Sequence, residues 1–85
     1  MAYTLEFEKA AIRSLKKLPP QVTGQVEADI RQLCQEPRPP GCKKLKGHSN
    51  LWRVRSGDYR VIYQIRDERL IVLIVDVGHR SSIYN

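Results

Sequence analysis

The chain is poor in cysteine, and this shortage argues against a zinc-binding protein. Cys34 and Cys42 are the only two cysteines among 85 residues, and neither has a His or Cys at ligand spacing beside it. Because a structural zinc ion takes four protein ligands, no zinc site is predicted. The two cysteines are predicted to be reduced thiols of a cytosolic protein.

The chain also lacks a long apolar run. Its most apolar stretch, LIVLIVDVG, is too short to span a bilayer. The first residues lack the basic start, apolar core and small-residue cleavage site of a signal peptide. We therefore expect a cytoplasmic protein.

Acidic residues are scarce in the second half of the chain. Residues 1–42 carry six Lys and Arg against five Asp and Glu, whereas residues 43–85 carry nine against four. The second half therefore holds nearly all of the net charge of +6. A basic half with interleaved aromatic residues favours a polyanionic partner, nucleic acid first and an anionic membrane second. The alternative is a solvated basic face that serves solubility.

Length and hydrophobic pattern predict a single domain over residues 1–85, because a chain this short can build one modest core. Alternation in YTLEF predicts a strand at about residues 2–7. Apolar residues at helical spacing then predict two helices, which form a hairpin over one sheet face. The first runs from Glu8 to the proline pair at 19 and 20, and the second from Pro20 or Gln21 through Leu33. The proline-rich EPRPPG ends the second helix and begins the one long connection, residues 36–50.

Three further strand patterns follow in close order. They are LWRVR (51–55), YRVIYQI (59–65) and RLIVLIVDVG (69–78), joined by the turns SGD and RDE, and they predict an antiparallel meander. The last of them is apolar on both faces, so it is expected to lie centrally in the sheet. The predicted order is β-α-α-β-β-β, an α+β layer pair.

Arginines recur in the most strand-like segment. Residues two apart in a strand point the same way, so Arg53 and Arg55 are expected to project from one face about 7 Å apart. That spacing suits successive phosphates of a nucleic-acid strand, and the SGD turn can bring Arg60 to the same face. Trp52 and Val54 would then face the core. An exposed sheet face also holds arginines routinely, but few acids are available to neutralise this one, which favours phosphate binding.

The last residues add chemically active groups to this basic half. A histidine such as His79 can exchange protons at physiological pH, a guanidinium such as Arg80 can stabilise a charged transition state, and the ring of Tyr84 can stack on a base. Together they are the parts of an RNA-cleaving site in which a 2′-hydroxyl attacks its own phosphate. Taken singly, each also has a structural explanation, as a solvated strand end or a packing anchor.

These segments together match a known pattern. YTLEF, two short helices, KKLKG, LWRVRSGDYRVIYQI and VDVGHRSSIY, in this order, resemble the RelE branch of the RelE/ParE toxins of prokaryotic type II toxin–antitoxin systems. The resemblance implies a microbial ribonuclease-like α+β fold. It also implies an endoribonuclease, without metal or other cofactor, that cuts messenger RNA in the ribosomal A site and inhibits translation. The implied partners are the ribosome, its mRNA and an antitoxin that wraps the toxin in a hetero-oligomeric complex, which binds DNA through the antitoxin.

The resemblance also implies roles for single residues. Arg60 and Arg80 would neutralise the scissile phosphate and its transition state, and Tyr84 would stack on a nucleotide. The residues predicted to be catalytic are Arg55, Arg60, His79, Arg80 and Tyr84, and those predicted to bind RNA or the ribosome are Lys43, Lys44, Lys46 and Arg53.

The meander pair departs from the family pattern, in which these positions are often lysine and one lysine has been proposed to take the 2′-hydroxyl proton. Arginine cannot readily do so, because its neutral form is almost absent. If Arg55 occupies the place of that lysine, either its role is purely electrostatic or another group acts as the base. His79 is the first candidate for that group, and Lys44 and Lys46 are weaker ones.

Two other functions fit the same fold. One is a ParE-like toxin that blocks DNA gyrase by protein binding, and the other is a non-catalytic relative that only binds its antitoxin. A gyrase binder does not need the basic and aromatic cluster, so the presence of this cluster favours the ribonuclease.

Overall fold

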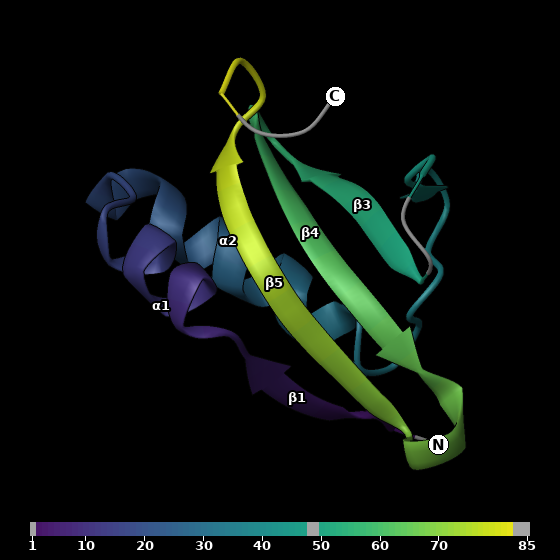
Figure 1. Ribbon diagram of the computed structural model, residues 1–85. Coiled ribbons are helices and arrows are strands. Elements are labelled where there is room, and N and C mark those ends of the chain that lie inside the picture. Colours follow the sequence, from purple (N-terminus) through teal and green to yellow (C-terminus); the bar gives the residue numbers. More distant parts are fainter. Residues whose placement is uncertain (1, 48–49, 83–85) are drawn as a thin grey trace.

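Two helices cover one face of a five-stranded sheet in the computed structural model, which describes residues 2–47 and 50–82 (Figure 1). The sheet order is β1-β5-β4-β3-β2. The elements are β1 (Thr4–Phe7), α1 (Lys9–Lys16), α2 (Pro20–Gln32), β2 (Lys43–Lys44), β3 (Leu51–Ser56), β4 (Tyr59–Arg66), the 3₁₀ helix η1 (Asp67–Arg69) and β5 (Ile71–His79). Apart from the short β2, this is the predicted β-α-α-β-β-β order, and the α+β class is confirmed.

The helix hairpin forms where the two prolines interrupt the helical pattern. Pro20 is the first residue of α2, a position that suits proline because its missing N–H would have no partner there and its φ is already helical. The helices turn Ala11, Val26 and Ile30 inward, and all three are buried. They pack on β-branched and aromatic residues of β4 and β5, and among the described residues no helix covers the other face of the sheet (Figure 1).

The β3–β4 hairpin turns through two residues, Gly57 and Asp58. Gly57 has φ 62°, and the flanking residues Ser56 and Tyr59 are paired. Gly57 has a positive φ and Asp58 does not, which is the pattern of a type II′ turn, and this turn matches the twist of paired strands. The hydroxyl of Ser56 donates to Asp29 of α2 at 2.6 Å, so the tip of the hairpin is fastened to the helix layer.

Strand β5 lies inside the sheet, as its two apolar faces predict. It pairs in parallel with β1 and antiparallel with β4, with an irregularity between Ile62 and Tyr63. Its Val72, Ile74 and Val77 join the core. At the top of Figure 1 the end of β5 comes beside the turn between β3 and β4. This convergence positions the site described below.

The long connection differs from the expected simple loop, because Lys43 and Lys44 form an edge strand. Lys43 pairs with Arg53 and Lys44 with Trp52. Upstream, the guanidinium of Arg38 lies 5.1 Å from the centre of the Trp52 ring and makes an ion pair of 2.9 Å with Asp67. The connection is therefore packed against the sheet at several points. A two-residue strand has too few residues to show an alternating pattern, so the sequence did not reveal it.

None of the helices within the described residues has the length and apolar character needed to cross a membrane.

Candidate active site

The sheet pairing gathers arginines on the face that the helices leave open. Arg55 pairs directly with Arg60 across β3 and β4, and Arg53 lies two residues from Arg55. Val54 and Val61, also paired, belong to the core on the helix side. Because side chains alternate along a strand, the arginines beside these valines point to the opposite face. The structure thus brings together the three arginines that the sequence placed on one face.

The centre of this group is Arg60. Partial burial, followed by the positive charges of Arg53, Arg55 and Arg80, lowers the pKa of the Arg60 guanidinium from its ordinary value. Like charges directly opposite in a sheet destabilise the pairing. A concentration of cations at a position where it costs stability indicates a binding site for an anion.

Arg80 joins the group from the end of β5. Its backbone N–H donates to the carbonyl of Asp58 at 2.9 Å, which ties the strand end to the hairpin turn. Its Nε lies 3.8 Å from a carboxylate oxygen of Asp58, and the two side chains are 57% and 69% exposed. An exposed ion pair of this length is weak, so a phosphate can compete for the guanidinium. The sequence predicted Asp58 only as a residue of the SGD turn. Its place directly before Tyr59 and Arg60 was the one signal that it lies near the basic residues.

The predicted lysines divide between the two sides of the sheet edge. Lys43 is exposed and pairs with Arg53, so it lies on the arginine side. Lys44 pairs with Trp52 and therefore points to the other side, and Lys46 is exposed in the connection after β2. We use the term basic face for Lys43, Arg53, Arg55, Arg60 and Arg80.

His79 is not brought together with the basic face. It pairs with Tyr59, and their rings meet edge to face, with centroids 5.4 Å apart and planes at 86°. Tyr59 packs against the core on the helix side. The imidazole therefore lies across the sheet from the arginines. The fifth residue predicted to be catalytic, Tyr84, lies outside the described residues.

Chemically, the basic face can bind a phosphate chain and stabilise negative charge that develops on it. Guanidinium groups contact phosphate oxygens in pairs and remain protonated, so their action is electrostatic. In residues 2–47 and 50–82, the His, Cys, Asp and Glu side chains form no cluster suited to a metal ion.

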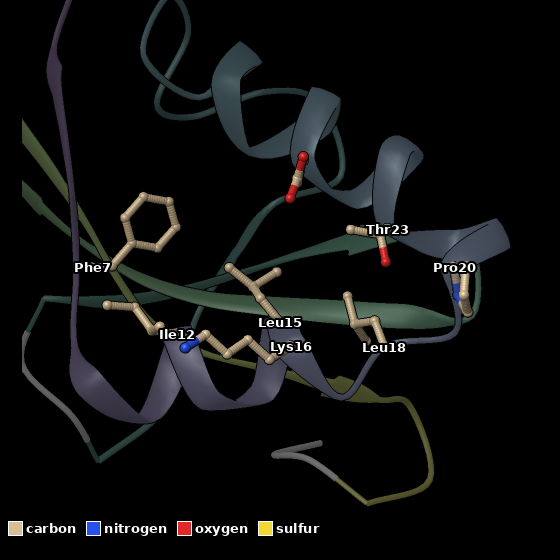
Figure 2. A pocket seen from close by; sticks show the side chains of 8 residues that line it. Phe7, Ile12, Leu15, Lys16, Leu18, Pro20 and Thr23 are labelled. Atoms are coloured by element: carbon tan, nitrogen blue, oxygen red, sulfur yellow. The ribbon is translucent and has the colours of Figure 1, made fainter.

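A second feature lies in the helix layer, well separated from the arginines by the sheet. It is a hollow of about 630 Å³ lined by Phe7, Ile12, Leu15, Lys16, Leu18, Pro20, Thr23 and Glu27. Figure 2 shows the apolar side chains of α1 facing α2 across it, with Phe7 of β1 at one end. A smaller hollow of about 310 Å³ continues it past Leu5 and Ile30 and shares Phe7, Leu15 and Glu27. Phe7 is 37% and Ile12 42% exposed, which is unusual for large apolar side chains. We call this surface the helix groove.

The fold agrees with comparisons to known proteins. The family model for the ParE toxin of type II toxin–antitoxin systems matches residues 5–84. The chain therefore belongs to the RelE/ParE family of toxins of type II toxin–antitoxin systems, and the resemblance noted in its sequence is confirmed.

Within this family the chain belongs to the RelE branch. It is 33% identical to mRNA interferase toxin RelE of Escherichia coli over 89 residues, covering 100% of this chain and 93% of that protein. It is 38% identical to Toxin RelG of Mycobacterium tuberculosis over 85 residues, covering 99% and 98%. Among solved structures, a RelBE toxin–antitoxin complex from M. tuberculosis matches with a TM-score of 0.85 and 34% identity, over 96% of this chain and 95% of that one.

Proposed function

We propose that this toxin is a ribosome-dependent endoribonuclease that cuts messenger RNA in the ribosomal A site. The observation that most supports the proposal is the basic face, in which Arg60 is surrounded by the charges of Arg53, Arg55 and Arg80. The name of the E. coli relative, an mRNA interferase, supports the same activity. Since the substrate is messenger RNA on a translating ribosome, we place the protein in the cytoplasm.

The chemistry needs no group beyond the RNA itself as nucleophile. The 2′-oxygen of one nucleotide attacks the adjacent phosphorus, a new O2′–P bond forms and the P–O5′ bond breaks. The products are a 2′,3′-cyclic phosphate and a free 5′-hydroxyl. One proton leaves the 2′-hydroxyl and one is added to the departing 5′-oxygen, so the atoms balance.

We assign the basic face two tasks in this reaction. Arg60 and Arg80, at the centre and at the strand end, stabilise the charge on the phosphorane-like transition state. Arg53, Arg55 and Lys43 hold the flanking phosphates in register. Because arginine stays protonated, Arg55 acts electrostatically in this scheme and does not serve as the base.

The rival functions make different demands. A gyrase-binding toxin needs a protein-docking surface but no phosphate-binding group, and the curated relatives that match at 33% and 38% identity are named RelE and RelG. A non-catalytic antitoxin binder would leave growth unaffected. Expression of the protein in bacteria, followed by mapping of mRNA 5′ ends and a gyrase supercoiling assay, separates the three. The proposal expects cuts within translated codons and normal supercoiling.

The helix groove supports the second part of the proposal, an antitoxin partner. Two of the matching solved structures, from M. tuberculosis and from the archaeon Pyrococcus horikoshii, are toxin–antitoxin complexes. An apolar groove between helices suits an amphipathic helix whose apolar side chains recur every three or four residues. Lys16 and Glu27 at its rim provide charges of both signs for polar contacts. We expect an antitoxin helix to bind here, on the opposite side of the sheet from the basic face.

A further inference from the structure

The segment that follows β5 is held on both sides of Arg80. On one side, the Arg80 N–H donates to the Asp58 carbonyl at 2.9 Å. On the other side, the chain folds back on His79: the N–H of Ser82 donates to the His79 carbonyl at 2.9 Å, and the Ser82 hydroxyl contacts the same oxygen at 3.3 Å. These contacts close a tight turn from His79 to Ser82 that contains Arg80, at a strand end that would otherwise fray.

The side chain of His79 is part of this turn. The N–H of Ser81 donates to His79 Nδ1 at 3.2 Å, and the Ser81 hydroxyl oxygen lies 2.8 Å from the same nitrogen. The other side of the ring rests edge to face on Tyr59, which packs against the core. Aromatic pairs of this geometry contribute beyond the area that they bury. The imidazole thus links the exposed turn to the body of the protein.

The hydrogen bond from Ser81 also fixes what the imidazole can do. A backbone N–H can only donate, so Nδ1 must offer a lone pair, and the proton of the neutral ring is then on Nε2. Nδ1, the ring nitrogen that carries no proton, therefore already accepts the hydrogen bond from Ser81. In addition, the ring lies on the helix side of the sheet, whereas Arg53, Arg55, Arg60 and Arg80 face the open side.

We propose that His79 is a positioning residue for Arg80, acting through the turn at Ser81 and Ser82, and does not itself transfer protons. This inference rests on the proposed function, since it concerns the placement of a guanidinium at the scissile phosphate. The position of the Arg80 guanidinium must be accurate. A shift of about 1 Å in a group that stabilises a transition state can lower the reaction rate about a hundredfold. His79 restrains the backbone on the side of Arg80 that Asp58 does not reach.

Two substitutions separate positioning from proton transfer. His79→Asn keeps an acceptor, since its Oδ1 is attached to the same Cγ position as Nδ1 and accepts the N–H two residues on, as in an Asx turn. His79→Ala removes both the acceptor and the ring. Neither variant can exchange protons near neutral pH, so a proton-transfer role predicts equal damage in both.

The activity experiment measures single-turnover cleavage of ribosome-bound mRNA at several protein concentrations. We expect His79→Ala to lower the maximal rate about tenfold to a hundredfold, with the half-saturating concentration changed less than about threefold. We expect His79→Asn to recover most of that loss. Equal maximal rates in the two variants would overturn the proposal.

A second measurement uses no RNA. Amide hydrogen exchange at Ser81 in the free protein is expected to be protected in the wild type and in His79→Asn and unprotected in His79→Ala. If the wild type cut no RNA, the proposed function would fail, and this measurement would still decide whether His79 holds the turn. Protection of Ser81 that survives in His79→Ala would show that it does not.

Discussion

Arg55 of β3 and Arg60 of β4 lie directly opposite each other on the face of the sheet that points away from α1 and α2. Two permanent cations at paired positions repel each other in the absence of an anion. The hairpin tolerates this because its other face is anchored, with Val54 and Val61 in the core and the Ser56 hydroxyl bonded to Asp29. This repulsion falls where the proposed function requires a phosphate to bind.

This arrangement predicts that activity and stability change in opposite directions at Arg55. Replacing the exposed Arg55 by Gln should raise the free energy of unfolding by about 0.2–1 kcal/mol, because it removes the repulsion toward Arg60. The same change should weaken RNA cleavage. Urea denaturation and a cleavage assay on one protein preparation measure both effects. A variant that loses stability together with activity would show that Arg55 has a structural role instead.

The strand-end arginine should be needed for the reaction and dispensable for folding. Arg80→Ala is expected to lower the cleavage rate about 10²- to 10³-fold, the loss typical when one group that stabilises transition-state charge is removed. Its exposed side chain predicts little change in the thermal midpoint. Arg69→Ala is the matched control, since Arg69 is exposed in η1 at the far end of the meander. Undiminished toxicity of a normally expressed Arg80→Ala protein would remove Arg80 from the site.

Binding through the basic face should depend on salt. Each phosphate that is neutralised releases counterions, so the affinity for single-stranded RNA should fall with a slope of about −0.7 per contact on a logarithmic plot. Arg53→Gln should reduce the steepness of that plot by about 0.7. Titrations of a short labelled RNA at several salt concentrations measure it. An affinity that is flat between low and moderate salt would contradict phosphate recognition.

The helix groove predicts a variant with separated functions. Ile12→Asp places a carboxylate in the groove and should abolish inhibition by the antitoxin while leaving toxicity intact. Ala10→Asp is the control, because Ala10 is exposed on the same helix, does not line the groove and undergoes the same change of charge. Co-expression with the cognate antitoxin, scored by growth and by co-purification, compares the two. Equal rescue of both variants would place the antitoxin elsewhere.

An acid-sensitive contact lies at the other end of the sheet. Hydrogen bonds from Arg38 and from the Tyr3 hydroxyl, the latter at 2.7 Å, lower the pKa of the Asp67 carboxyl. A carboxylate with a lowered pKa stabilises the fold above the pKa of the unfolded chain, about 3.9, and loses that contribution as the pH falls through its folded value. The stability difference between wild type and Asp67→Asn should therefore shrink below about pH 4. Parallel denaturation curves of the two proteins at several pH values measure the difference, and a difference that stays constant below about pH 4 would contradict the assignment.

Local sequence patterns predicted the elements well, because each is determined mainly by its own residues. The prolines at 19 and 20 divide the helices, and alternation in LWRVR and YRVIYQI sets which side chains share a face. That alternation was sufficient to place Arg53, Arg55 and Arg60 together. The parallel pairing of β1 with β5 and the packing of Arg38 on Trp52 are contacts between distant segments, which no local period reports.

The position of His79 could not be read from the sequence for a related reason. Strand β5 is apolar on both faces, so its pattern does not show which way a given side chain points. The irregularity opposite Ile62 and Tyr63 adds a further change of register. Only the pairing with Tyr59 shows that the imidazole lies on the helix side. The sequence did not indicate Asp58 and Ser81, because their relevance depends on contacts that exist only in the folded chain. Asp58 contacts Arg80, and Ser81 contacts His79.

The most direct test is cleavage by the purified protein of mRNA on programmed ribosomes, with mapping of the cut. We predict a cut in the A-site codon that requires the ribosome, leaves a 2′,3′-cyclic phosphate and is lost in Arg80→Ala. Intact mRNA at saturating protein, together with inhibition of DNA gyrase by the same preparation, would contradict it.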